Sequence, residues 1–122
     1  MTRNELQKRY DAGERNFKSE DFFGVDLRNI VLEGVNFQNV NFQNVNLQNA
    51  NFENCNFENC NFKNVDLSYA RIKKSNFKYS NFEVSDLSYT IIEDANFESA
   101  DLYKSSLTGT YIENCNFKNV NL

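Results

Sequence analysis

Histidine, tryptophan and proline are all absent from this chain of 122 residues, and glycine occurs only four times. The missing histidine removes the most common general acid–base group and the most common metal ligand, so catalysis and metal binding lose their usual residue. The missing proline leaves a backbone N–H on every residue, so a ladder of backbone hydrogen bonds can run through the chain without interruption.

An excess of positive charge and long apolar runs are missing as well. The 13 basic and 17 acidic side chains give a net charge of −4, which argues against direct binding of nucleic acid because such binders normally carry a basic patch. No apolar stretch approaches the roughly 18 residues of a membrane span, and residues 1–17 do not resemble a secretory leader. We therefore expect a soluble, cytoplasmic protein without membrane contact.

The chain is built instead from a five-residue repeat. Every fifth residue from Phe17 to Leu122 is Phe, Leu or Ile, and Phe23 is the only one of 12 phenylalanines outside this column. Two residues before each of them stands a second column that holds only Val, Ile, Ala, Cys, Ser or Thr from Val25 onward. The residue between the two columns is mostly Asn or Asp, and the two residues after the large apolar residue are mostly polar. Such a unit fits neither a helix nor a long strand, but it fits a chain that bends once per unit, with two residues inward and three outward.

The columns sort again at a period of 20 residues. Positions 17, 37, 57, 77, 97 and 117 are all Phe, and a second column from Leu27 to Leu107 is all Leu. Residues 20 apart must therefore stack, so four units form one square coil, and residues 15–122 form about five coils. At about 4.8 Å per layer the tower is roughly 25 Å tall. The predicted core includes Phe37, Phe57, Phe77, Phe97, Leu47, Leu67 and Leu87.

The units VNFQN, VNLQN, ANFEN, CNFEN and VDLSY resemble the pentapeptide-repeat protein family, whose common motif is A(D/N)LXX. The resemblance covers residues 15–122 and implies that family's fold, an all-β solenoid known as the right-handed quadrilateral β-helix. Frequent Phe at the centre and Val, Cys or Ser in place of Ala depart from the motif, which changes the filling of the core and not the architecture. With its helix at the N-terminus the chain is most similar to small cyanobacterial members, which have no settled function.

The two ends of the tower differ. Residues 1–14 are predicted to be a capping segment, with a helix over residues 2–12 that begins with a Thr2–Glu5 capping box and covers the first coil. Phe23 is expected to pack beneath this helix. Phe117 and Leu122 lie on the last coil, where an exposed apolar cross-section favours association. Our hypothesis is an end-to-end homodimer through these C-terminal coils.

No group of residues indicates catalytic chemistry or a cofactor. The three cysteines, Cys55, Cys60 and Cys115, all fall in the small inward column, which favours core packing and a reducing compartment over a disulfide framework. The carboxylates Asp26, Asp66 and Asp86 form one column, but they repeat a turn position where Asn and Asp alternate. We therefore predict a protein that is not an enzyme and binds no cofactor or metal.

The outward positions hold one unusual group of side chains. By the register, Tyr69, Arg71, Tyr89, Ile91 and Tyr111 share one edge in the C-terminal half, a composition typical of protein-binding surfaces. The alternative interpretation is ordinary aromatic stacking that rigidifies a sheet face. We predict a non-enzymatic protein-interaction or scaffold module, with a protein partner whose identity the sequence does not give.

The family resemblance implies a second possible function. Some pentapeptide-repeat proteins protect DNA gyrase from quinolones by imitating the shape and charge of duplex DNA. This chain shares their rod shape and mild acidity, but it lacks their stronger negative charge, projecting loops and C-terminal dimerising helix.

Overall fold

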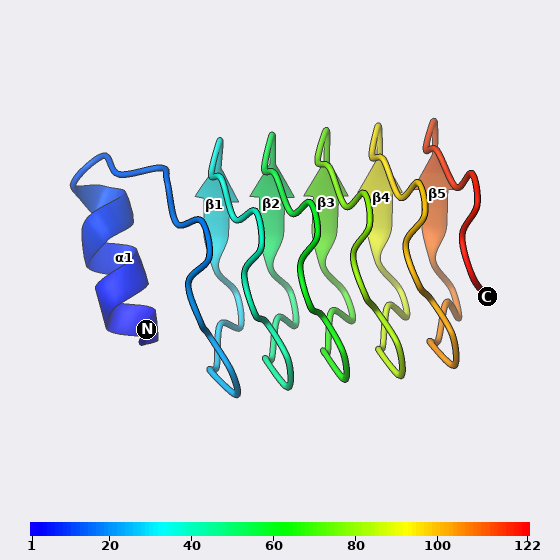
Figure 1. The fold of residues 1–122 in the computed structure, drawn as a ribbon, viewed down its shortest axis with the longest axis horizontal. Coiled ribbons are helices and arrows are strands. Elements are labelled where there is room, and N and C mark those ends of the chain that lie inside the picture. Colours follow the sequence, from blue (N-terminus) through cyan, green and yellow to red (C-terminus); the bar gives the residue numbers. More distant parts are fainter.

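A computed structural model describes all residues, 1–122, as one helix followed by a parallel β-solenoid (Figure 1). The helix α1 spans Arg3–Asp11. Five strands then form a single parallel sheet in sequence order, so that each coil lies against the next. The strands are β1 (Val31–Glu33), β2 (Asn51–Glu53), β3 (Arg71–Lys73), β4 (Ile91–Glu93) and β5 (Tyr111–Glu113).

The register confirms the predicted square coil of 20 residues. Val31 pairs with Asn51, Asn51 with Arg71, and so on through the sheet. Isolated bridges on the other three sides of the coil also join residues 20 apart, as in Asn16–Asn36, Asp21–Asn41 and Asp26–Asn46. Four full turns of the solenoid therefore separate β1 from β5.

The interior is filled by the central column of the repeat. The seven predicted core residues are almost completely buried. The ring of Phe57 stacks between Phe37 and Phe77, at centroid distances of 5.3 and 4.8 Å. Burial of each such side chain stabilises the fold by about 1.5–3 kcal/mol. The core prediction is therefore confirmed, and the space inside each coil is occupied by side chains.

The residue between the two inward columns explains the abundance of Asn and Asp. On three sides of the coil its side-chain oxygen accepts a hydrogen bond from the backbone N–H two residues later, as between Asn36 and Gln38 at 3.1 Å. The column of Asp26, Asp66 and Asp86 has this same turn role, as predicted. On the fourth side the chain forms the true strands β1–β5, which do not need this bond. The corresponding column is therefore free to hold Val31, Asn51, Arg71, Ile91 and Tyr111.

Helix α1 covers the first coil by both packing and hydrogen bonding. Its capping box at Thr2 and Glu5 forms as predicted, and Leu6 is completely buried. The amino group of Met1 donates to the carbonyl of Asp21, and Tyr10 accepts a bond from the N–H of Glu33. Backbone groups that have no preceding coil thus find partners on the helix.

Two further details concern this end of the molecule. Phe23 does not pack beneath α1, because it points outward on the first coil and keeps 55% of its surface exposed. That expectation was wrong: Phe23 follows the central residue Phe22, and the side chain at this position is at least partly exposed in every unit except at Ser68. In addition, the structure contains no helix with the length and apolar character needed to cross a membrane.

Candidate partner-binding edge

The structure brings the five predicted surface residues together along one edge. Strand pairing places Arg71, Ile91 and Tyr111 in register on β3, β4 and β5. Tyr69 and Tyr89 precede β3 and β4 by two residues, so they line the corner beside this row. We call Tyr69, Arg71, Tyr89, Ile91 and Tyr111 the tyrosine edge. Whether a partner binds there stays a prediction.

Two tyrosines form the exposed face of this edge. The rings of Tyr69 and Tyr89 stack with centroids 5.2 Å apart and planes 15° from parallel. Although stacked, they keep 57% and 51% of their surfaces exposed. The pair therefore presents a flat aromatic surface to solvent.

The backbone beneath these tyrosines is strained. In every unit, the second residue after the central apolar residue has a positive φ, with values of 62° at Tyr69 and 58° at Tyr89. We call this the left-handed position. Asn and Gly tolerate such a conformation, whereas other residues are destabilised by about 1–2 kcal/mol. The eight left-handed positions from Asn29 to Asn64 accordingly hold only Asn or Gly.

The next eight left-handed positions contain neither Asn nor Gly. They are Tyr69, Lys74, Tyr79, Val84, Tyr89, Asp94, Ser99 and Lys104. After them Gly109, Asn114 and Asn119 return to the favoured residues. The sequence pattern had indicated only a mostly polar column, so the change was not predicted. The signal was present in the sequence, as the point at which the run of Asn at every fifth residue stops.

Electrostatic contacts at the far end of the edge involve Tyr111. Its hydroxyl donates a hydrogen bond to Glu113 at 3.0 Å. The Glu113 carboxylate that accepts this bond raises the pKa of Tyr111. Glu93 and Glu113 pair in register on β4 and β5, so this end of the sheet is acidic.

A shallow hollow of about 310 Å³ adjoins the edge on the outer face of the sheet. Arg71 and Ile91 lie on one side of it, and Glu53, Lys73 and Glu93 lie on the other. Arg71 takes part in none of the four ion pairs of the structure, so its guanidinium is available as a donor.

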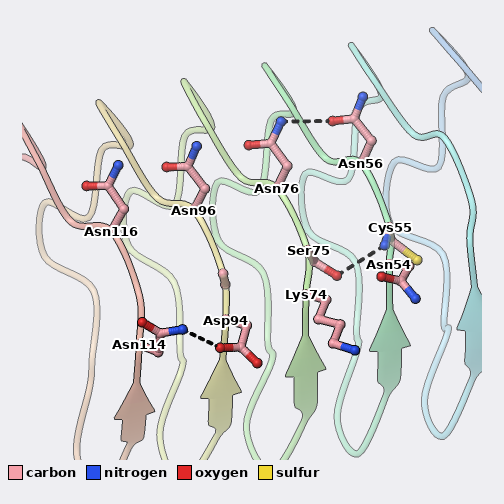
Figure 2. A pocket seen from close by; sticks show the side chains of 11 residues that line it. Asn54, Cys55, Asn56, Lys74, Ser75, Asn76, Asp94, Asn96, Asn114 and Asn116 are labelled. Atoms are coloured by element: carbon pink, nitrogen blue, oxygen red, sulfur yellow. Dashed lines mark hydrogen bonds between the residues drawn. The ribbon is translucent and has the colours of Figure 1, made fainter.

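A second groove, of about 480 Å³, runs along the corner that follows the sheet (Figure 2). Asn56, Asn76, Asn96 and Asn116 stack along one side of it on successive coils. The Asn76 amide donates to Asn56 at 3.3 Å, and on the other side Asn114 donates to Asp94 at 2.6 Å. The groove is therefore a polar surface on which neighbouring coils are linked by side-chain hydrogen bonds.

The cysteines lie in the inward column as predicted. Burial raises the pKa of Cys55 to about 11 and that of Cys60 to about 12, so neither thiol forms a thiolate near neutral pH. Cys115 is half-buried on the last coil, and burial raises its pKa as well. No group of three or more Cys, Asp or Glu side chains lies close enough together to hold a metal ion.

The last coil carries the predicted association surface. Leu107, Ile112, Phe117, Val120 and Leu122 line an entirely apolar hollow of about 290 Å³, which we call the open end. Leu122 keeps 77% of its surface exposed. Phe117 is only partly buried, because its ring stacks on Phe97 on one side alone.

Comparison with known proteins identifies the class to which this solenoid belongs. A family model described as pentapeptide repeat region matches residues 50–122, and one described as pentapeptide repeats (8 copies) matches residues 21–59. The chain therefore belongs to the pentapeptide-repeat family. The comparison with curated proteins gives no match.

Solved structures share the fold. Trypsin-treated QnrB1, a plasmid-mediated fluoroquinolone resistance protein, superposes with a TM-score of 0.69 at 21% identity, over 87% of this chain and 55% of that one. A pentapeptide repeat protein from the Arabidopsis thaliana thylakoid lumen gives a TM-score of 0.63 at 22% identity, over 85% of this chain and 69% of that one. The chain thus spans little more than half the length of QnrB1, and identities this low establish the fold alone.

Proposed function

We propose that this protein is a non-enzymatic interaction module that binds a protein partner along the tyrosine edge. The observation that carries the proposal is the presence of exposed tyrosines at strained left-handed positions, where the preceding coils use Asn. Tyr69 and Tyr89 stand in the same column as Asn29 and Asn49. Tyr79 has the same strain and a similar exposure, so the feature that singles out this edge is the stack of Tyr69 on Tyr89, which leaves two adjacent aromatic rings half exposed and favours a partner.

The neighbouring side chains support the same surface. Tyrosine and arginine are enriched among the residues that dominate binding energy at protein interfaces. Arg71 and Ile91 are placed beside the tyrosines by the sheet, and a rigid solenoid fixes all of them before a partner arrives. Such preorganisation lowers the entropic cost of association.

Absence of catalysis belongs to the same proposal. The inward positions are consumed by packing, and burial keeps the Cys55 and Cys60 thiols protonated. Cytoplasmic location likewise stays a prediction, which the three unpaired cysteines support.

The test is affinity capture from the organism that encodes the protein, with three forms of the chain as bait. One bait is the natural chain, the second carries Tyr69→Asn and Tyr89→Asn, and the third carries Tyr79→Asn. Tyr79 has the same left-handed backbone and a similar exposure on a different edge, so it is a matched control. We expect one protein to be captured by the natural and Tyr79→Asn forms and lost with the double variant. Equal capture by all three forms would refute binding at this edge.

Protection of DNA gyrase is the alternative, and the likeness to QnrB1 is the observation that introduces it. The charge pattern argues against it, because a mimic of DNA needs negative charge along the whole rod. Here Lys73 stands between Glu53 and Glu93 in its column, and Lys78 lies 4.0 Å from Glu98. We expect no relief of quinolone inhibition in a gyrase supercoiling assay at about 10–100 μM protein. Relief at that concentration would establish the alternative.

End-to-end pairing through the open end is a separate proposal about assembly. Its support is the group of apolar side chains around Phe117 and Leu122, whose burial would stabilise a dimer. We expect light scattering at micromolar concentration to give twice the monomer mass, and Phe117→Glu to restore the monomer. A monomeric mass for the natural chain would reject the pairing.

A further inference from the structure

Tyrosine is the main oxidisable side chain on the surface of this protein. The chain has no Trp and no His, and its only Met is the first residue. Cys55 and Cys60 are buried in the inward column, and Cys115 is half-buried, so oxidants reach the thiols poorly. Five of the six tyrosines, in contrast, keep between 46% and 57% of their surfaces exposed. An oxidant in solution therefore meets phenol groups first.

Only two of these phenols lie against each other. Tyr69 and Tyr89 stack with ring centroids 5.2 Å apart, and no other tyrosine stacks on an aromatic ring. The hydroxyl of Tyr111 is bonded to Glu113, whereas those of Tyr69 and Tyr89 make no hydrogen bond within the chain. A radical formed on either ring of the stack thus has a second phenol beside it at a very high local concentration.

The backbone gives the two rings the same orientation. Tyr69 and Tyr89 leave the chain from equivalent left-handed positions, at φ values of 62° and 58°, on adjacent coils. Their Cε atoms, which flank the hydroxyl, therefore lie at matching distances from the backbone. Gly109 lies closest to the Cδ1 and Cε1 edge of Tyr89, so the Cε2 edge is farther from that contact. Because the rings are half exposed, they can turn about the Cβ–Cγ bond and bring two Cε edges together.

We propose that Tyr69 and Tyr89 are a site of oxidative cross-linking, at which a haem peroxidase and hydrogen peroxide join them as dityrosine. Each hydroxyl gives one hydrogen atom to the oxidant, which leaves two phenoxyl radicals. Their unpaired electrons form a bond between a Cε atom of each ring, and the hydrogen on each of those carbons moves to the ring oxygen. Both hydroxyls are restored, and the two hydrogen atoms removed reduce one hydrogen peroxide to two water molecules. The inference goes beyond the proposed function, since it needs no protein partner.

The cross-link would tie two adjacent coils of the solenoid. It joins residues 20 apart in the sequence, and closing a loop restricts the unfolded chain as a disulfide does. We expect the linked chain to unfold at a higher urea concentration than the untreated chain. Unfolding at a lower concentration would show that the bond forms only from a distorted coil, and would overturn the inference.

The test is oxidation of the full chain by a haem peroxidase with limiting hydrogen peroxide, at micromolar protein so that coupling within one chain dominates. Trypsin then gives residues 64–71, which contain Tyr69 as their only tyrosine, and residues 79–104, which contain Tyr89. We expect these two peptides to be joined, with dityrosine fluorescence and a mass two hydrogen atoms below their sum. Fragmentation of the joined peptides should place the bond at Tyr89.

Matched variants decide whether the stack directs the reaction. Tyr69→Phe and Tyr89→Phe each keep a ring in the stack but remove one hydroxyl, so each should lower the yield of linked single chains at least about tenfold. Tyr79→Phe removes an equally exposed phenol from another edge and should leave the yield unchanged. An equal yield in all three variants would refute the site. Oxidation that gives only linked dimers, or only singly modified tyrosines, would refute it as well.

Discussion

The ring of Tyr89 lies directly over Gly109, one coil further along the same column. A Cβ atom on Gly109 would lie 2.5 Å from Cδ1 and 2.6 Å from Cε1 of that ring, closer than non-bonded atoms approach. Gly109 thus leaves the space into which the stacked pair of Tyr69 and Tyr89 extends. The three residues form one continuous platform along the edge.

This contact predicts different effects for the same substitution at two glycines. Gly34 also has a left-handed backbone, but its surroundings are open, so Gly34→Asn should raise stability by about 0.5 kcal/mol or leave it unchanged. Gly109→Asn keeps a tolerated backbone and forces the ring of Tyr89 to move. We expect the near-ultraviolet circular dichroism of the tyrosine pair to change in Gly109→Asn only. Unaltered spectra in both variants would contradict the packing of Tyr89 on Gly109.

Val84 gives a test of backbone strain away from the tyrosine edge. It is a β-branched residue with a φ of 60°, and it keeps 46% of its surface exposed. Val84→Asn should therefore raise the free energy of unfolding by about 1 kcal/mol, measured by urea denaturation. The reciprocal change Asn64→Val, one coil earlier in the same column, should lower it by a similar amount. A loss of stability in Val84→Asn would show that the valine side chain supports the fold.

The stacked core predicts a large effect at Phe57. Its ring is completely buried between Phe37 and Phe77, so Phe57→Ala leaves a cavity and should cost about 3–5 kcal/mol of unfolding free energy. The control is Phe23→Ala, which removes the same atoms from an exposed site and should change stability by less than about 0.5 kcal/mol. Chemical denaturation of the two variants measures both values. A cost below about 1 kcal/mol at Phe57 would contradict the stacked interior.

Asp26 and Arg28 predict a dependence on pH at the first coil. Hydrogen bonds from the Arg28 side chain hold the pKa of Asp26 at about 2, below its ordinary value of 3.8. Because the folded pKa is the lower one, this stabilisation is present above pH 3.8 and is lost as the pH falls through about 2. Arg28→Gln should move the Asp26 pKa toward its ordinary value in an NMR titration, without reaching it because the backbone N–H of residue 28 still donates. An unchanged Asp26 pKa in Arg28→Gln would mean that the ion pair does not form in solution.

The sequence predicts most of this architecture because burial restricts the residue types at the inward positions, which makes the two inward columns visible as a repeat. Large apolar residues recur every five residues, and the same residue type recurs every 20. A square coil of four units is the arrangement that places identical residue types on top of one another. The same register placed Tyr69, Arg71, Tyr89, Ile91 and Tyr111 on one edge, and strand pairing agrees. The capping box at Thr2 was readable because it is a purely local pattern.

The remaining features depend on backbone geometry that residue type reports only indirectly. The left-handed position was not recognised, since Asn serves equally as a turn residue and as a residue with positive φ. The packing of the Tyr89 ring on Gly109 could not be inferred either, because it depends on the direction in which the ring tilts along the column. Phe23 was misplaced because a large apolar side chain was assumed to seek the helix, whereas its position in the repeat points it outward.

Tyr69 and Tyr89 are proposed to serve a partner and not the fold. Equilibrium unfolding of the Tyr69→Asn, Tyr89→Asn variant tests this most directly. Relief of backbone strain at the two left-handed positions should raise the free energy of unfolding by about 2 kcal/mol or more. Loss of the exposed aromatic pair should lower it by about 0.5–1.5 kcal/mol. We therefore predict that the double variant unfolds at the same urea concentration as the natural chain or at a higher one. A fall of more than about 1 kcal/mol would contradict the claim and show that the tyrosine stack stabilises the solenoid itself.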